Sequence, residues 1–191
     1  MKKLLNPIEF YNDRKLLIVN LIIFIVGTVL ATVLLATFDS PIDLSFSDKI
    51  VPKRTIIGNI ISTLSLCLAL LIAGKIINKK TRLIDCLNLG MYLRIPYYLL
   101  TFINSSYFFS DQTLKIKENT QTDFLKEFGL TEMIFGYALV FFLISFLVFQ
   151  VILVYRSFKT ICNAKKTSDY LILVSFILVF IIISSLIIRN I

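Results

Sequence analysis

An arginine and a proline stand two residues apart in the stretch GMYLRIPYYLL, residues 90–100, inside a long apolar run. Arg94 carries a planar guanidinium, which matches phosphate oxygens in bidentate fashion. Pro96 lacks an amide hydrogen and disrupts the helical hydrogen bond to the carbonyl of Tyr92. The pair therefore predicts a kinked helix with a cation beside the kink, and phosphate binding is the chemistry that this combination offers.

Arg94 lies five residues past Leu89, about 8 Å into an apolar span. In a span that runs outwards from the cytoplasm, its side chain leans back and can snorkel toward the inner headgroups. Asn20 and Gln150 fall at similar depths, so we expect an inner-leaflet polar layer of Asn20, Arg94 and Gln150, closed around the kink at Pro96. Arg94 then either contacts a lipid phosphate or a substrate, or serves as a snorkelling anchor that packs the bundle, which is the favoured interpretation.

Residues for catalysis are scarce. The chain has no histidine, which removes the usual general base and the commonest metal ligand. No aspartate or glutamate falls deep within a span, no phosphate-binding glycine loop is present, and the spacing of Cys67, Cys86 and Cys162 makes no metal motif. We therefore expect neither an enzyme, nor a cofactor, nor a metal site.

The composition is that of a membrane protein. Of 191 residues, 57% are hydrophobic, and the mean hydropathy is +0.85. A bilayer core needs about 20 apolar residues per helix, and charged or proline-containing segments separate five stretches that meet or approach this length. These sequences predict an all-α polytopic bundle of five transmembrane helices, forming a single membrane domain over residues 1–191, with spans at about 16–38, 55–77, 89–109, 133–155 and 171–188.

The basic residues are unevenly distributed along the chain. Three segments that alternate to one side hold twelve: Lys2, Lys3, Arg14 and Lys15; Lys75, Lys79, Lys80 and Arg82; Arg156, Lys159, Lys165 and Lys166. The other side holds seven: Lys49, Lys53, Arg54, Lys115, Lys117, Lys126 and Arg189. The positive-inside rule then predicts a cytoplasmic N-terminus and an outside C-terminus.

The net charge of +8 fits a membrane surface better than nucleic acid. The basic residues flank the spans, where they anchor helices and attract anionic headgroups on the cytoplasmic side. We therefore expect membrane lipids as partners, and no nucleic acid.

Small residues recur in the second span at helical spacing, which lets helices approach closely in lipid. They are Gly58, Ser62, Ser65, Ala69 and Ala73. We expect this span to be the packing centre of the bundle, and general packing is favoured over a dedicated dimer motif.

Two further expectations concern the predicted outer side. The loop after the first span alternates Ile42, Leu44 and Phe46 with polar residues, which predicts a short extended piece. Asn59 and Asn104 fall at similar depths near the outer ends of their spans and form a candidate outer polar layer.

Three stretches of the chain carry a family resemblance: NPIEFY at 6–11, LIDCLNLGMYLRIPYYLLTFIN at 83–104 and FKTICNAKKT at 158–167. The chain resembles the short bacterial branch of the Yip family, five-span membrane proteins named for interaction with Ypt/Rab GTPases. The resemblance implies functional importance for Arg94, Pro96, Asn163, Lys165 and Lys166. It also implies membrane shaping or traffic, with oligomers formed through the spans.

These observations favour a non-enzymatic integral membrane protein that organises lipid or partner proteins, as a homo-oligomer or with a membrane-protein partner. The composition, rich in lysine, isoleucine and asparagine, favours a bacterial cytoplasmic (inner) membrane. A transporter or channel component for a small solute is the alternative. Five spans do not divide into two equal repeats, and one embedded charge is little to line a pathway.

Overall fold

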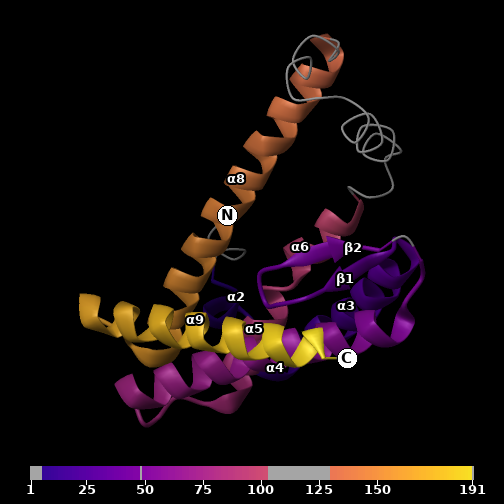
Figure 1. Ribbon diagram of the computed structural model, residues 1–191. Helices are drawn as coiled ribbons and strands as arrows, with labels where there is room; N and C mark the ends of the chain where they lie inside the picture. The colour runs from indigo at the N-terminus through magenta and orange to yellow at the C-terminus, as the bar shows by residue number, and fades with distance from the viewer. Residues whose placement is uncertain (1–5, 48, 103–129, 191) are drawn as a thin grey trace.

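The computed structural model describes residues 6–47, 49–102 and 130–190 of the chain. Its elements are mostly helices, and a small two-stranded sheet lies between helices α3 and α4 in the chain (Figure 1). They are α2 (Pro7–Phe10), α3 (Asp13–Val33), β1 (Ala36–Phe38), β2 (Leu44–Phe46), α4 (Pro52–Ile77), α5 (Leu83–Tyr92), α6 (Ile95–Leu100), α8 (Leu130–Cys162) and α9 (Thr167–Arg189).

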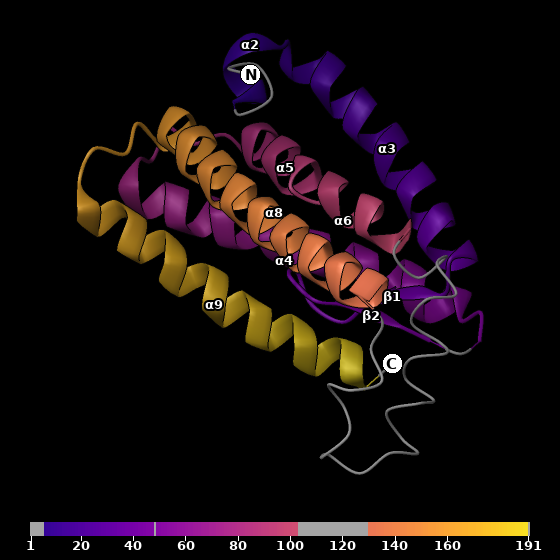
Figure 2. The same ribbon diagram turned by 90° about the horizontal axis from the view of Figure 1, so that it is seen from above.

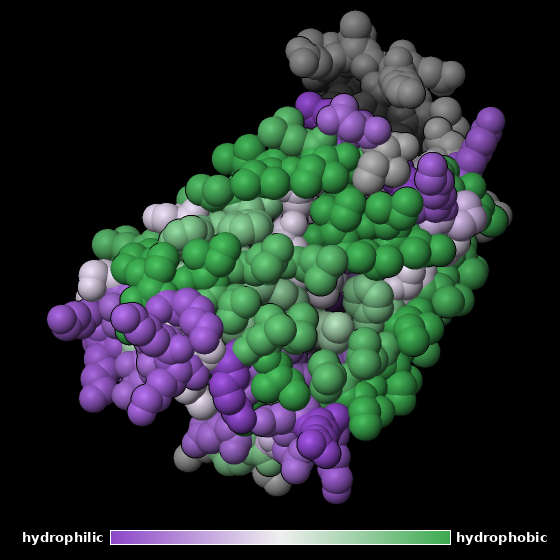
Figure 3. Space-filling view, turned by 90° about the horizontal axis from the view of Figure 1, so that it is seen from below, coloured by the Kyte–Doolittle hydropathy of each residue, from purple (hydrophilic) through white to green (hydrophobic). Residues whose placement is uncertain are grey.

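Among the described residues, four helices are long and apolar enough to cross a membrane. They are α3, α4, the part of α8 over Val140–Cys162, and α9, with mean hydropathies of 2.7, 2.3, 2.1 and 3.2. Figure 3 shows the matching surface, on which a hydrophobic band separates hydrophilic residues gathered at opposite ends. The chain is therefore a mostly helical integral membrane protein, which confirms the predicted class.

The third predicted span, residues 89–109, is not one continuous helix. Two shorter helices replace it. Helix α5 begins earlier than predicted, at Leu83, and a break before Ile95 separates it from α6. The end of that span, from residue 103, lies outside the described residues. Pro96 near the start of α6 accounts for the break, because a proline ring cannot continue the hydrogen bonding of the preceding turn.

Helix α4 is the centre of the bundle. It packs most extensively on α9 and also contacts α3, α5, α8 and β1. Of its most apolar window, 56% is buried, against 28% for α3 and 17% each for α8 and α9. Its small residues are all buried, namely Gly58, Ser62, Ser65, Ala69 and Ala73. Neighbouring backbones can therefore approach α4 closely at these positions.

The two strands form an antiparallel hairpin that pairs Ala36 with Phe46 and Phe38 with Leu44. The extended piece predicted around residues 44–46 is present, but residues 36–38 were predicted as the end of the first span. That boundary is wrong, since α3 ends at Val33 and Leu35 takes a left-handed φ of 59°. A bulky residue in this conformation cannot continue an α-helix, and the chain turns into β1.

Successive long helices alternate in sense, so the connecting segments gather at two ends (Figure 2). At one end lie α2 and the turns after α4 and α8. Two contacts join these segments directly: Asn78 Nδ2 donates to the carbonyl of Cys162 at 3.3 Å, and Arg82 pairs with Asp13 at 2.9 Å. We call this the basic end, because the three basic segments predicted to share one side meet here as far as they are described. The hairpin lies at the other end.

Candidate functional site

Arg94 lies at the break between α5 and α6. Its amide donates to the carbonyl of Met91 at 3.0 Å, and its own carbonyl accepts from Tyr97 at 3.0 Å and Tyr98 at 3.3 Å. Pro96 follows in the first turn of α6, where its missing amide hydrogen removes no helical bond. The break thus fixes the backbone of Arg94 at a point where the chain changes helix.

The guanidinium of Arg94 is fully buried, with an exposed fraction of 0%. Its Nε and Nη2 donate to Oδ1 of Asn59 at 3.3 and 3.1 Å, and its Nη1 donates to the carbonyl of Pro41 at 2.8 Å. The rings of Phe38 and Tyr97 lie 4.5 and 5.0 Å from the guanidinium carbon. Within the described part of the chain, no carboxylate pairs with Arg94, so hydrogen bonds and ring faces stabilise its charge.

Asn59 connects this cation to two further helices. Its Nδ2 donates to Oγ1 of Thr28 on α3 at 2.7 Å and to the hydroxyl of Tyr98 on α6 at 3.0 Å. Asn59 therefore belongs to a polar cluster, although it was predicted to share an outer layer with Asn104, which lies outside the described residues. The cluster is closed to solvent and ties the hairpin, α3, α4 and α6 together.

The predicted inner-leaflet layer of Asn20, Arg94 and Gln150 is wrong as a single layer. Asn20 Nδ2 donates to the carbonyl of Asn88 at 3.1 Å, and Gln150 Nε2 donates to the carbonyl of Leu93 at 3.0 Å. Gln150 does reach the kink, but the Arg94 side chain turns toward the hairpin end. Acceptors inside the protein satisfy the guanidinium there, so it does not snorkel toward the basic end or reach headgroups.

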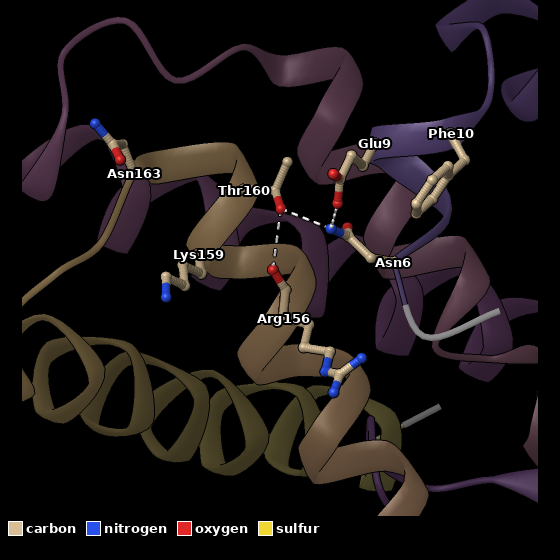
Figure 4. A pocket seen from close by; sticks show the side chains of 7 residues that line it. All are labelled: Asn6, Glu9, Phe10, Arg156, Lys159, Thr160 and Asn163. Atoms are coloured by element: carbon tan, nitrogen blue, oxygen red, sulfur yellow. Dashed lines mark hydrogen bonds between the residues drawn. The ribbon is translucent and has the colours of Figure 1, made fainter. Parts of the chain in front are cut away.

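A second polar site lies at the basic end, where α2 packs against the last turns of α8 (Figure 4). It is a partly open pocket with a cavity volume of about 600 Å³. Residues from the N-terminal stretch form one wall and residues from the end of α8 form the other. The lining residues are Asn6, Glu9, Phe10, Arg156, Lys159, Thr160 and Asn163.

Hydrogen bonds through Asn6 hold the two walls together. Its Nδ2 donates to Oε2 of Glu9 at 2.6 Å and to Oγ1 of Thr160 at 2.7 Å, and Thr160 donates onward to the carbonyl of Arg156 at 3.2 Å. Asn6 is only 7% exposed, and its Oδ1 finds no donor among the described residues. The pocket wall thus contains a buried acceptor that the described residues leave unsatisfied.

Two cations line this pocket without ion-pair partners in the described structure. Arg156 and Lys159 are exposed and one turn apart on α8. Figure 4 shows their charged ends pointing in different directions, and because both side chains are long and exposed, they can turn toward one anion. The pocket continues toward Asn163, whose left-handed φ of 53° begins the turn into α9. Its neighbours Lys165 and Lys166 are exposed, and their backbone amides each donate to Oδ2 of Asp169 at 3.0 Å, which leaves both ammonium groups at the surface.

By contrast, Arg82, another arginine at the basic end, is neutralised by carboxylates. Arg82 pairs with Asp85 at 2.8 Å and with Asp13 at 2.9 Å. Hydrogen bonds to Asp85 raise the pKa of Arg82 above its ordinary value, and the charges of Asp85 and Asp13 add to this. Arg82 therefore fastens α5 to the start of α3, whereas Arg156 and Lys159 remain available to an external anion.

Sequence reasoning missed six of the pocket residues as site residues: Asn6, Glu9, Phe10, Arg156, Lys159 and Thr160. A signal was present, because the stretches at 6–11 and 158–167 both carry the family resemblance. The structure packs these two stretches on each other through the Asn6–Thr160 bond. Their juxtaposition joins residues 154 positions apart, which no local pattern shows.

The fold and the pocket define an integral membrane protein with an open polar site at its basic end. Scans against protein-family models, curated proteins and solved structures each found no match. The function of this protein is therefore inferred from the chemistry of its described residues.

Proposed function

We propose that this protein is a non-enzymatic membrane organiser that binds lipid phosphates at its basic end and thereby arranges lipid or partner proteins around itself. The observation that carries the proposal is the pocket between α2 and α8. It presents Arg156 and Lys159, unpaired within the described structure, beside the surface ammonium groups of Lys165 and Lys166.

The position of the pocket supports a lipid ligand. Phe10 and Tyr11 are 45% and 50% exposed at this end, and exposed aromatic rings are typical of the membrane–water interface. Basic residues near an anionic leaflet contribute about 1 kcal/mol each to attraction. A phosphate at headgroup depth would be attracted by the two cations that line the pocket.

The proposal includes a location and a family. The basic end faces the cytoplasm under the positive-inside rule, in a bacterial inner membrane, with the C-terminus outside. The resemblance to the short bacterial branch of the Yip family supports a membrane-shaping role through a homo-oligomer or a membrane-protein partner. Among the residues that the resemblance implies, Asn163, Lys165 and Lys166 lie at the basic end, whereas Arg94 and Pro96 belong to the buried break.

The test is lipid retention by the purified full chain, measured by native mass spectrometry after exchange into phosphatidylglycerol. We expect the double variant Arg156→Ala/Lys159→Ala to retain this lipid about tenfold less, since two cations near a phosphate are lost. The control Lys79→Ala/Lys80→Ala removes the same charge from the same end outside the pocket and should retain the lipid. Equal loss in both double variants would contradict a defined site, and unchanged retention in the first would contradict the pocket.

The alternative of a transporter or channel component receives less support from the geometry. Arg94, a charge embedded among the helices, is closed to solvent and bonded to Asn59 and Pro41. An organiser should show no saturable solute uptake in liposomes. Saturable uptake by the reconstituted protein would overturn the proposed function.

A further inference from the structure

We infer that the pocket between α2 and α8 receives the headgroup of an aminophospholipid, with its phosphate beside Arg156 and Lys159 and its ammonium group beside Glu9. This inference rests on the proposed function and names the lipid class that the site would select. It follows from the charges of the two walls, which have opposite sign.

The α8 wall is cationic and the α2 wall is anionic. Glu9 on α2 is exposed and lines the pocket, and within the described residues it forms no ion pair. Oε2 of Glu9 accepts a hydrogen bond from Nδ2 of Asn6, and Oε1 has no partner among the described residues. A ligand that carried only negative charge would satisfy the α8 wall but would be repelled by this carboxylate. A zwitterionic phosphoethanolamine group satisfies both walls.

Two neighbours of Glu9 also favour a cationic group. Asn6 Oδ1, a buried carbonyl oxygen for which the described residues provide no donor, lies on the same wall, and a buried acceptor gains free energy from an N–H donor. The ring of Phe10 lines the same wall, and aromatic faces attract ammonium groups. The α2 wall thus provides a carboxylate, a carbonyl oxygen and an aromatic ring, which is the chemistry of an ammonium site.

The surroundings of the pocket favour a lipid over a soluble phosphate ester as the ligand. The pocket opens at the end of α8, whose span exposes large apolar side chains on the same helix face as Arg156, such as Val148 and Ile152, which are 53% and 37% exposed. Acyl chains attached to a headgroup in this pocket could lie along that face. A soluble ester with the same headgroup lacks this contribution and should bind more weakly.

The experiment uses the delipidated full chain with an equimolar mixture of phosphatidylethanolamine, phosphatidylcholine and phosphatidylglycerol of identical acyl chains. Native mass spectrometry reports the ratio of bound lipids. We expect phosphatidylethanolamine to exceed phosphatidylcholine by about threefold, because the methylated ammonium cannot donate a hydrogen bond and a solvated ion pair is modest. Glu9→Gln should abolish this preference, while its side-chain oxygen still accepts from Asn6 and preserves the wall.

The outcomes separate the inference from the proposed function. Equal retention of phosphatidylethanolamine and phosphatidylcholine, or a preference that survives Glu9→Gln, overturns the ammonium site. Dominant phosphatidylglycerol retention that depends on Arg156 and Lys159 overturns the inference and leaves the proposed function standing. Retention of none of the lipids overturns both, and displacement of the lipid by equimolar glycerophosphoethanolamine overturns the commitment to a membrane ligand.

Discussion

At the scale of single residues, Arg94 is a structural cation rather than a headgroup contact. A charge moved out of water is expensive unless its donors are satisfied, and Arg94 meets this demand through Asn59, the Pro41 carbonyl and two aromatic rings. The geometry bears on the two interpretations of the sequence. The sequence favoured a snorkelling anchor that packs the bundle. The Arg94 guanidinium is 0% exposed, so it contributes to packing, but it connects the hairpin to α4 and does not snorkel.

This arrangement predicts that losing the partner harms the fold more than losing the charge. Asn59→Leu keeps the shape but removes the acceptor of Arg94 Nε and Nη2, so we expect it to lower the free energy of unfolding by about 3 kcal/mol. Arg94→Met removes the desolvated charge together with its hydrogen bonds and should cost less. Thermal unfolding in detergent provides the measurement. The double variant should resemble Arg94→Met alone, and additive losses would show that the two side chains do not interact.

At the scale of elements, α4 organises the bundle because its small residues admit backbones that larger side chains would exclude. Gly58 shows this most clearly. A Cβ built on Gly58 would lie 2.5 Å from the carbonyl oxygen of Phe38 in β1. The hairpin therefore sits directly on α4, which brings Pro41 within reach of Arg94.

We expect Gly58→Ala to push β1 away from α4 and to destabilise the fold by about 1–3 kcal/mol, the usual range for overpacking. The clash is with backbone, so no side-chain rotation relieves it. Val174→Ile is the control, because it adds one carbon at a position of α9 that is 52% exposed. Melting temperatures of the two variants in the same detergent would decide the matter. An unchanged melting temperature for Gly58→Ala would contradict the close contact.

At the scale of the whole molecule, the alternating helices place the turns after α4 and α8 at the same end as α2, and the hairpin at the opposite end (Figure 2). A hydrophobic band between two hydrophilic ends (Figure 3) is the surface that a bilayer requires. The lipid pocket that we propose then faces one leaflet only.

Cysteine labelling with a membrane-impermeant reagent tests this topology. The native Cys67, Cys86 and Cys162 are free but buried, so they should give little background. Lys79→Cys and Lys165→Cys should react from the same side, and Ile42→Cys, at a position 59% exposed in the hairpin loop, from the opposite side. The positive-inside rule predicts that the first two positions are cytoplasmic. Reaction of all three from one side would refute the arrangement of the ends.

The sequence by itself determined the membrane class, four of the five predicted spans as long apolar helices, the buried small-residue face of α4 and the break near Pro96. Each of these follows from residues close together in the chain, through hydropathy averaged over about 20 residues or through local backbone chemistry. Only the second strand of the hairpin could be predicted from the sequence. Leu44 and Phe46 alternate with polar residues, whereas Ala36 and Phe38 continue an apolar run.

Only the tertiary structure decided where the polar side chains point. Arg94 finds its acceptors 35 and 53 positions away along the chain, and Asn6 finds Thr160 at a separation of 154. Hydrogen bonds act over about 3 Å, so their partners depend on which helices become neighbours. Helix packing sets these neighbours, and it turned Arg94 toward the hairpin and opened the pocket at the basic end.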